Sequence, residues 1–259
     1  MARVSRVVEA YGDHPLQCGE WFVPEATGRL PTVVLIHGGF WRERYDRHLE
    51  DPLALDLAAR GYLCWNIDYR SAATGWPATL LDAAAAYDHI AVSSIADRVD
   101  SRRIAVVGHS AGGQLAAWLA SRHRLPPGAP GSDPALPPPE MCIPQSGVVA
   151  LAEAARRRLG DRAVLDLIGG GPDECPDRYA VADPIGLLPT GVHTVVVHTV
   201  DDTTVPIELS EAYVAAARAA GDDATLVRAP GGHYDHLDPV TAAADRLREA
   251  LGEPQPLAD

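Results

Sequence analysis

The sequence is most informative at Ile104-Ala105-Val106-Val107-Gly108-His109-Ser110-Ala111-Gly112. Four apolar residues of strand length lead into the pattern G-x-S-x-G, and a helical pattern begins near Gly112. Small residues two before and two after the serine let a strand and a helix approach closely, so Ser110 would occupy a sharp, strained turn with its hydroxyl in open space. The other interpretation is an ordinary strand-to-helix loop in which Ser110 caps the helix. The order of strand, turn and helix favours a nucleophilic serine.

Short apolar runs alternate with longer Ala- and Leu-rich stretches along the chain. This alternation is typical of the α/β class, a mostly parallel sheet with helices on both faces. Turn residues between the first two runs predict an N-terminal antiparallel hairpin. Strands are predicted at 4–10, 17–23, 32–36, 63–67, 104–107, 141–143, 194–198 and 225–228. Helices are predicted at 52–60, 78–92, 112–122, 207–220 and 240–251.

The chain is interpreted as one domain over residues 1–259, a length at which a single core can bury most of the apolar surface. Prolines are so dense in residues 125–140 that an exposed loop is predicted there. The next stretch, 151–168, is helical in pattern and ends at a run of glycines. A small lid within 125–190 could therefore fold over the strand ends.

Composition narrows the class of protein. With 47% hydrophobic and 22% charged residues, the chain has the composition of an ordinary globular protein. Its formal charge of −13 argues against nucleic acid as a partner, because phosphate binding depends on Lys and Arg clusters. No apolar stretch reaches the length of a signal peptide or a membrane span, so we expect no membrane partner and a cytoplasmic location. Monomer and homodimer both remain open.

The four cysteines are far apart in the sequence, without a metal-ligand spacing. Two of them, Cys64 and Cys142, lie inside apolar runs. We therefore expect reduced thiols with a structural role, and a disulfide or zinc site is the weaker alternative.

A second motif follows the predicted strand 32–36. It reads His37-Gly38-Gly39-Phe40-Trp41. Adjacent glycines allow the backbone to turn its N–H groups inward, as stabilisation of a tetrahedral oxyanion requires. Alone, the motif would be a plain tight turn. Combined with the Ser110 turn, it predicts an oxyanion hole from Gly38, Gly39 and Phe40 together with the N–H of Ala111.

An acid and a base are predicted after two later strands. Asp201 and Asp202 follow the strand 194–198, and His233 follows the strand 225–228 after two glycines. This gives the order Ser, Asp, His, in which an imidazole takes the serine proton and a carboxylate fixes the imidazole. Spacing alone does not choose between the two aspartates. His236 competes with His233 for the base, although the preceding glycines favour His233.

Taken together, these motifs resemble the esterase and prolyl-oligopeptidase-like branch of the α/β-hydrolases. The resemblance also includes Trp65 through Arg70, Trp76-Pro77 and Gly113 through Ala116. Many members read H-G-x-x-D-x-x-V-P near the acid; aligning His198 and Val205-Pro206 to that pattern puts Asp202 on the acid. This chain has Thr199 where the family usually has glycine, and Asp201 therefore stays as the alternative for the acid. The pairing of H-G-G-x-W with S-A-G-G is similar to kynurenine formamidases and small bacterial acyl-ester hydrolases.

The resemblance implies that Ser110 attacks an acyl carbonyl, His233 shuttles the proton, and no metal or organic cofactor is needed. Trp41, Trp76 and His109 are candidates for the substrate pocket. The leading hypothesis is hydrolysis of a carboxylic ester of a small or medium substrate, and the alternative is an arylformamidase. A ligand-binding module without catalysis and acyl transfer to an acceptor other than water are further hypotheses.

Overall fold

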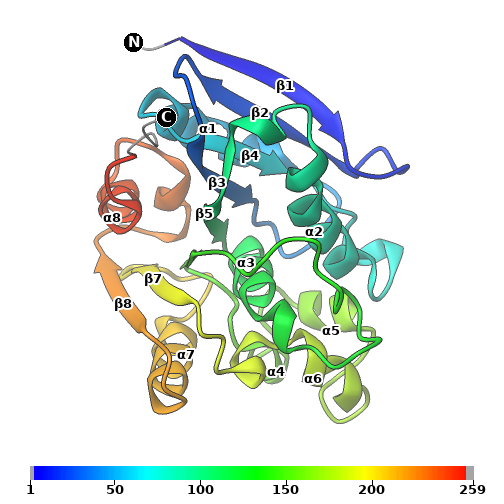
Figure 1. Cartoon of the computed structure of the whole chain (residues 1–259). Helices are drawn as coiled ribbons and strands as arrows, with labels where there is room; N and C mark the ends of the chain where they lie inside the picture. The colour runs from blue at the N-terminus through cyan, green and yellow to red at the C-terminus, as the bar shows by residue number, and fades with distance from the viewer. Residues whose placement is uncertain (1–2, 255–259) are drawn as a thin grey trace.

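One sheet organises the fold. In a computed structural model that describes residues 3–254, eight strands lie in the order β1-β2-β4-β3-β5-β6-β7-β8 (Figure 1). All neighbours from β4 to β8 in this order are parallel, whereas β2 runs antiparallel to both β1 and β4. This confirms the predicted mostly parallel sheet with an N-terminal antiparallel hairpin. The strands are β1 Val4–Ala10, β2 Cys18–Pro24, β3 Leu30–Ile36, β4 Leu63–Ile67, β5 Val99–His109, β6 Met141–Gln145, β7 His193–Thr199 and β8 Ala224–Ala229.

Helices cover both faces of the sheet, as predicted. On one face, α1 (Asp51–Ala59) and α8 (Ala242–Leu251) pack against a core that includes Val33. On the other face, α2 (Ala78–His89), α3 (Ala111–Ser121) and α7 (Ile207–Ala219) pack against a core that includes Val34. Successive residues of a strand point to opposite faces, so the apolar run of β3 supplies both cores.

The carboxyl ends of the parallel strands lie along one edge of the sheet. There β3, β5, β6, β7 and β8 end at Ile36, His109, Gln145, Thr199 and Ala229. In open α/β sheets the loops after these ends form the crevice in which ligands bind. Both predicted glycine-containing motifs, the two aspartates and His233 follow these ends, and the fold therefore brings them to one edge.

The predicted helix 151–168 is wrong in one respect, because two short helices replace it. They are α4 (Leu151–Arg156) and α5 (Ala163–Ile168). Between them Arg158, Gly160 and Asp161 have φ values of 56°, 60° and 63°. A left-handed backbone cannot continue a right-handed helix, so the chain breaks here. A third short helix, α6 (Pro176–Ala182), was not predicted.

Smaller differences lie at helix ends. The final residues of the predicted helix 78–92 form a 3-10 turn, Ile90–Val92, after α2. Helix α8 begins at residue 242, because the Thr241 side chain accepts a hydrogen bond from the Ala244 N–H and caps it. Residues 125–140 contain neither helix nor strand, as predicted. Every helix in the described part of the chain is too short or too polar to cross a membrane.

All four cysteines are free thiols, as expected from their separation in the sequence. Cys64 on β4 and Cys142 on β6 are buried in the two cores. Burial raises the pKa of both thiols, which keeps them protonated and unreactive at neutral pH.

Glu50 carries a carboxyl group that is buried without a partner. It ends the 3-10 turn η1 (Arg47–Glu50), and the residue is 1% exposed. Neither of its carboxylate oxygens has a hydrogen-bond partner among the described residues. A buried charge without compensation is costly, and burial raises the pKa of Glu50 to about 8.

We expect Glu50→Gln to stabilise the protein at alkaline pH. The unfolded chain loses this proton near the ordinary pKa of 4.5, whereas the folded state keeps it up to about pH 8. The contribution of Glu50 to stability is therefore fully present at low pH and is lost as the pH rises toward 8. Because the amide cannot ionise, the variant should exceed the parent protein by about 2 to 4 kcal/mol at alkaline pH, and this advantage should shrink toward pH 5.

Urea unfolding of both proteins across this pH range measures the difference. Glu25→Gln is the matched control, because the Glu25 side chain is 67% exposed. A Glu50→Gln advantage that does not change with pH would contradict the interpretation.

Candidate active site

Ser110 occupies a strained turn between β5 and α3. Its backbone has φ 56° and ψ −115°, a conformation that costs a residue other than glycine about 1 to 3 kcal/mol. Two hydrogen bonds join the turn to the end of β6 and the loop that follows it. The Ser110 N–H donates to the Gln145 carbonyl at 2.8 Å, and the Ser110 carbonyl accepts from the Val148 N–H at 3.2 Å. The serine is thus fixed at the carboxyl end of β5, beside the N-terminus of α3.

Glycines at 108 and 112 are required by the close approach of three elements. A Cβ on Gly108 would lie 2.1 Å from the carbonyl oxygen of Gly112. A Cβ on Gly112 would lie 1.9 Å from the carbonyl oxygen of Ile36, at the end of β3. Both contacts are with backbone in a close-packed interior, which cannot move aside cheaply. This is the physical reason for the small residues around Ser110.

The glycine loop (residues 37–41) approaches the serine through Gly38. A Cβ on Gly38 would lie 3.0 Å from the Cβ of Ser110. Within residues 3–254, no hydrogen bond uses the N–H groups of Gly39, Phe40 or Ala111. Ala111 opens α3, and the first N–H groups of a helix have no partner inside it. The elements on either side of Ser110 therefore offer backbone donors suited to a developing negative charge.

Contacts from the neighbouring segments hold the glycine loop in shape. Phe40 and Trp41 both have left-handed backbones, with φ values of 52° and 54°. The Trp41 side chain is fully buried, and its carbonyl accepts from the Ala72 N–H at 2.8 Å. The Tyr69 hydroxyl donates to the His37 carbonyl at 2.9 Å, and the two rings stack at 4.3 Å. These contacts fix the loop before any ligand binds.

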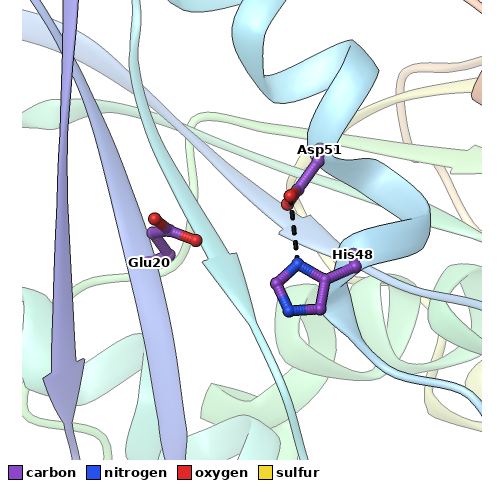
Figure 2. Close-up of side chains that lie close together, drawn as sticks. All are labelled: Glu20, His48 and Asp51. Atoms are coloured by element: carbon purple, nitrogen blue, oxygen red, sulfur yellow. Dashed lines mark hydrogen bonds and ion pairs between the residues drawn. The ribbon is translucent and has the colours of Figure 1, made fainter.

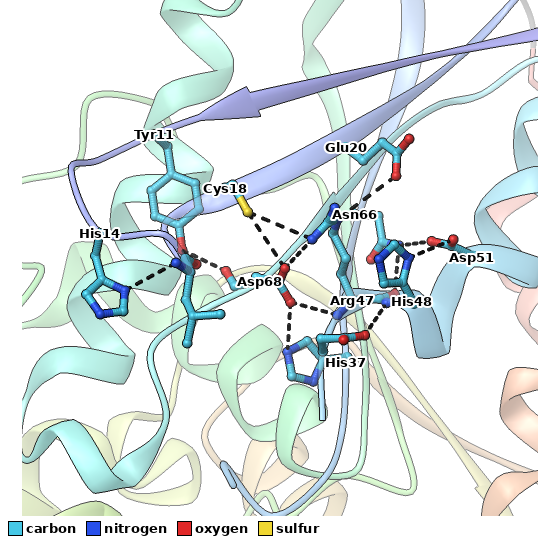
Figure 3. Close-up of polar contacts among 12 residues, drawn as sticks. Tyr11, His14, Cys18, Glu20, His37, Arg47, His48, Asp51, Asn66 and Asp68 are labelled. Carbon is cyan, nitrogen blue, oxygen red and sulfur yellow. Dashed lines mark hydrogen bonds and ion pairs between the residues drawn. The ribbon is translucent and has the colours of Figure 1, made fainter. Parts of the chain in front are cut away.

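A polar network centred on Asp68 lies behind His37 (Figure 3). The Asp68 carboxylate accepts from the backbone N–H of Arg47 at 2.7 Å and also binds its guanidinium. His37 Nε2 lies 3.7 Å from Asp68 Oδ1. The Tyr11 hydroxyl donates to the Asp68 carbonyl at 2.7 Å. Burial lowers the pKa of His37, so its ring is neutral and serves to support the loop.

Glu20, His48 and Asp51 lie close together beside this network (Figures 2 and 3). Their nitrogen and oxygen atoms that could bind a metal lie within 4.8 Å of one another. Arg6 donates to both Glu20 oxygens at 2.7 and 2.8 Å and to Asp51 Oδ2 at 2.9 Å. Asp51 Oδ2 also bonds His48 Nδ1 at 3.0 Å. Because one guanidinium binds both carboxylates, the arrangement is an ion-pair network that links β1 and β2 to α1.

Asp202 and His233 are joined by a hydrogen bond at the same edge of the sheet. His233 Nδ1 lies 2.7 Å from Asp202 Oδ2, and the side chains are 4% and 1% exposed. The other Asp202 oxygen accepts from the N–H groups of Thr204 and Val205 at 2.8 and 2.9 Å. Asp201, which the sequence left as an alternative, is exposed. The geometry therefore places Asp202, and not Asp201, behind the imidazole.

The surroundings of Asp202 keep it ionised. Burial acts to raise its pKa, but the hydrogen bond and charge of His233, with the two backbone donors, hold the pKa of Asp202 well below its usual range. His198 supports the same loop, because its Nε2 donates to the Val205 carbonyl at 3.0 Å and its Nδ1 accepts from Ser210 Oγ at 2.8 Å. Burial lowers the pKa of His198, so the aspartate faces a neutral ring there.

His233 packs against His109, the last residue of β5. It begins the 3-10 turn η7 (His233–Leu237). The ring of His109, the residue before Ser110, donates from Nε2 to the His233 carbonyl at 2.9 Å. The two imidazole rings lie 4.5 Å apart. The hydroxyl, the imidazole and the carboxylate therefore come from loops that converge on one edge of the sheet.

A cavity of about 630 Å³ opens beside the glycine loop. Phe40 and Trp41 line it from the loop, Ala72 from the 3-10 turn η2 (Ala72–Thr74), and Leu165 from α5. Its volume suits a small or medium ligand. The other two candidates for the pocket, His109 and Trp76, do not line this cavity. His109 packs against His233, and the Trp76 ring lies 5.8 Å from the Arg178 guanidinium.

Two polar side chains near Ser110 and His233 are fully buried. One is His236, which competes with His233 for the role of base in the sequence. Gln145 was not singled out, although it ends β6 beside Ser110 and is also fully buried. A glutamine that closes an apolar strand run was the available signal, since a buried amide needs partners.

The sheet order is that of an α/β-hydrolase fold, and the strained serine turn and the hydrogen-bonded Asp202–His233 pair lie at one edge of that sheet. Residues 21–216 match the model of the BD-FAE family, and the chain belongs to that family.

Known proteins with similar sequences and structures are named as esterases. Esterase LipQ of Mycobacterium tuberculosis is 27% identical over 231 residues, which cover 87% of this chain and 55% of LipQ. The chain thus spans about half the length of that relative. A truncated carbohydrate esterase from gut microbiota superposes with a TM-score of 0.80 at 20% identity, covering 95% of each chain. An acetyl ester-xyloside bifunctional hydrolase from Caldicellulosiruptor lactoaceticus gives a TM-score of 0.69 at 26% identity, covering 85% of this chain and 80% of that one.

Proposed function

We propose that this protein hydrolyses carboxylic esters of small or medium size through an acyl-enzyme. The observation that carries the proposal is the 2.7 Å hydrogen bond between Asp202 and His233, at the sheet edge where Ser110 stands on its strained turn. A carboxylate on Nδ1 leaves Nε2 of the imidazole free to accept a proton. The names of LipQ and of the Caldicellulosiruptor hydrolase agree with ester cleavage.

In the proposed reaction the Ser110 oxygen attacks the ester carbonyl carbon while His233 Nε2 takes the serine proton. The carbonyl oxygen becomes negative and accepts hydrogen bonds from the backbone of Gly39 or Phe40 and of Ala111. The C–O bond then breaks, and the leaving alcohol takes the proton from His233. Water attacks the acyl-enzyme with the same proton transfers, which releases the carboxylic acid and restores the serine.

The cavity supports a substrate of limited size. It borders the glycine loop, so a substrate whose carbonyl lies at the loop N–H groups can place one of its two halves there. Phe40 and Leu165 give the cavity apolar surface, and Arg42 and Asp166 give it charged groups. A formamide hydrolase would use the same serine, imidazole and backbone donors, which is why the arylformamidase alternative needs a direct test.

The test compares p-nitrophenyl acetate, butyrate and octanoate with N-formylkynurenine. A cavity of about 630 Å³ has room for each of the three acyl chains, so we expect all three esters to be turned over. Activity confined to the formamide would reject the ester proposal in favour of the arylformamidase. If no acyl substrate turns over, a fluorophosphonate probe labels nothing and the protein tightly retains a small ligand, the ligand-binding module is favoured. Quantifying the free acid distinguishes hydrolysis from acyl transfer.

A further inference from the structure

The turn η7 is held by hydrogen bonds at two points, one at the end of β5 and one directly after β6. The first anchor is the hydrogen bond from His109 to the His233 carbonyl at 2.9 Å. The second lies three residues further on, where His236 Nε2 bonds Ser146 Oγ at 2.9 Å. The ring of His236 also lies 5.6 Å from that of His109. The segment that carries the imidazole of His233 is therefore tied to the ends of β5 and β6.

Gln145 joins this second anchor to the serine. Its backbone carbonyl accepts the Ser110 N–H at 2.8 Å. Its side-chain amide bonds His236 Nδ1 at 3.4 Å. Both side chains are fully buried. One residue thus touches the backbone of the nucleophile on one side and the turn that carries the base on the other.

We propose that Gln145 and His236 are positioning residues that set the distance and direction between the Ser110 hydroxyl and the His233 imidazole. They act through backbone and turn contacts and do not touch the reacting atoms. The inference rests on the proposed function, because it assigns His233 the role of base.

The hydrogen bonds of His236 require an uncharged ring. His236 Nδ1 accepts from the Gln145 amide, so its proton lies on Nε2, which donates to Ser146. Burial, together with the nearby His233 and His198, lowers the pKa of His236 to about 3. Burial and the same His233 hold the pKa of His109 well below its usual value. Neither ring competes with His233 for the proton, and each keeps one fixed tautomer that orients η7.

The test uses Gln145→Leu, His236→Leu and the double variant. A displacement of about 1 Å at a reacting group can cost on the order of 100-fold in rate. We therefore expect each single variant to lower kcat per active site by roughly 10- to 100-fold, with KM for p-nitrophenyl butyrate within about threefold of the parent protein. Because the two side chains act as one bridge, the double variant should lose little more than the worse single variant.

Active sites are counted by titration with a fluorophosphonate, so that a partly unfolded sample does not imitate slow catalysis. His193→Gln is the control. His193 begins β7, its side chain is 40% exposed, and it pairs with Asp223. Single variants with parental kcat per titrated site, or losses that multiply in the double variant, would overturn the inference. If His236→Leu does not fold, Gln145→Leu and Ser146→Ala answer the question. A parent protein without labelling or turnover would instead refute the proposed function.

Discussion

Ser110→Ala should lower kcat for a short p-nitrophenyl ester by about 10⁶-fold. The remaining rate is the residual catalysis that the backbone donors and substrate binding provide without a nucleophile. The hydroxyl is the atom that forms the acyl-enzyme, and neither Asp202 nor His233 can take its place. The substitution keeps a Cβ beside Gly38 and leaves the Ser110 backbone bonds to Gln145 and Val148 unchanged. Loss of activity should therefore occur without loss of the fold.

Turnover, fluorophosphonate labelling and thermal unfolding measured together test this expectation. The parent protein should incorporate one probe per chain and the variant none, while the unfolding temperatures stay close. Ser5→Ala, on the edge strand β1, is the control serine and should label and turn over normally. Residual turnover within about tenfold of the parent protein would show that another residue supplies the nucleophile.

The fold could be predicted from the sequence because its signals are local. The apolar runs of β3, β4 and β7 mark buried parallel strands by themselves, since both sheet faces are covered. The glycines around Ser110 could also be interpreted, because small residues two before and two after a serine between a strand and a helix are typical of close backbone approach. Where a pattern depends on a few neighbouring residues, the expectation and the structure agree.

What could not be predicted depends on contacts between distant segments. Asp201 and Asp202 have the same chemistry, and only the position of His233, 31 residues beyond Asp202, distinguishes them. The break between α4 and α5 arises where Phe40 packs on Gly160: a Cβ there would lie 2.6 Å from the ring. That contact spans more than a hundred residues of sequence. The Gln145–His236 bridge is of the same kind, because its members are 91 positions apart in the sequence.

Asp202→Asn should lower kcat by about 10³- to 10⁴-fold with little change in KM, because it reverses the tautomer of His233. Asp202 Oδ1 accepts from the N–H groups of Thr204 and Val205. In the variant the amide oxygen must take that place, so the NH₂ group faces His233 Nδ1. Nδ1 then has to accept a hydrogen bond, the imidazole proton moves to Nε2, and Nε2 can no longer take the proton of the serine.

Asp201→Asn is the matched control, because Asp201 is exposed. The substitution also keeps the backbone hydrogen bond from the Asp201 N–H to the Gly231 carbonyl. It should keep parental kcat, and both variants should unfold cooperatively near the parental temperature. The comparison is made by steady-state kinetics at neutral pH on titrated active sites. A larger loss in Asp201→Asn than in Asp202→Asn would reverse the assignment of the acid, and equal small losses in both would mean that His233 is oriented by other groups.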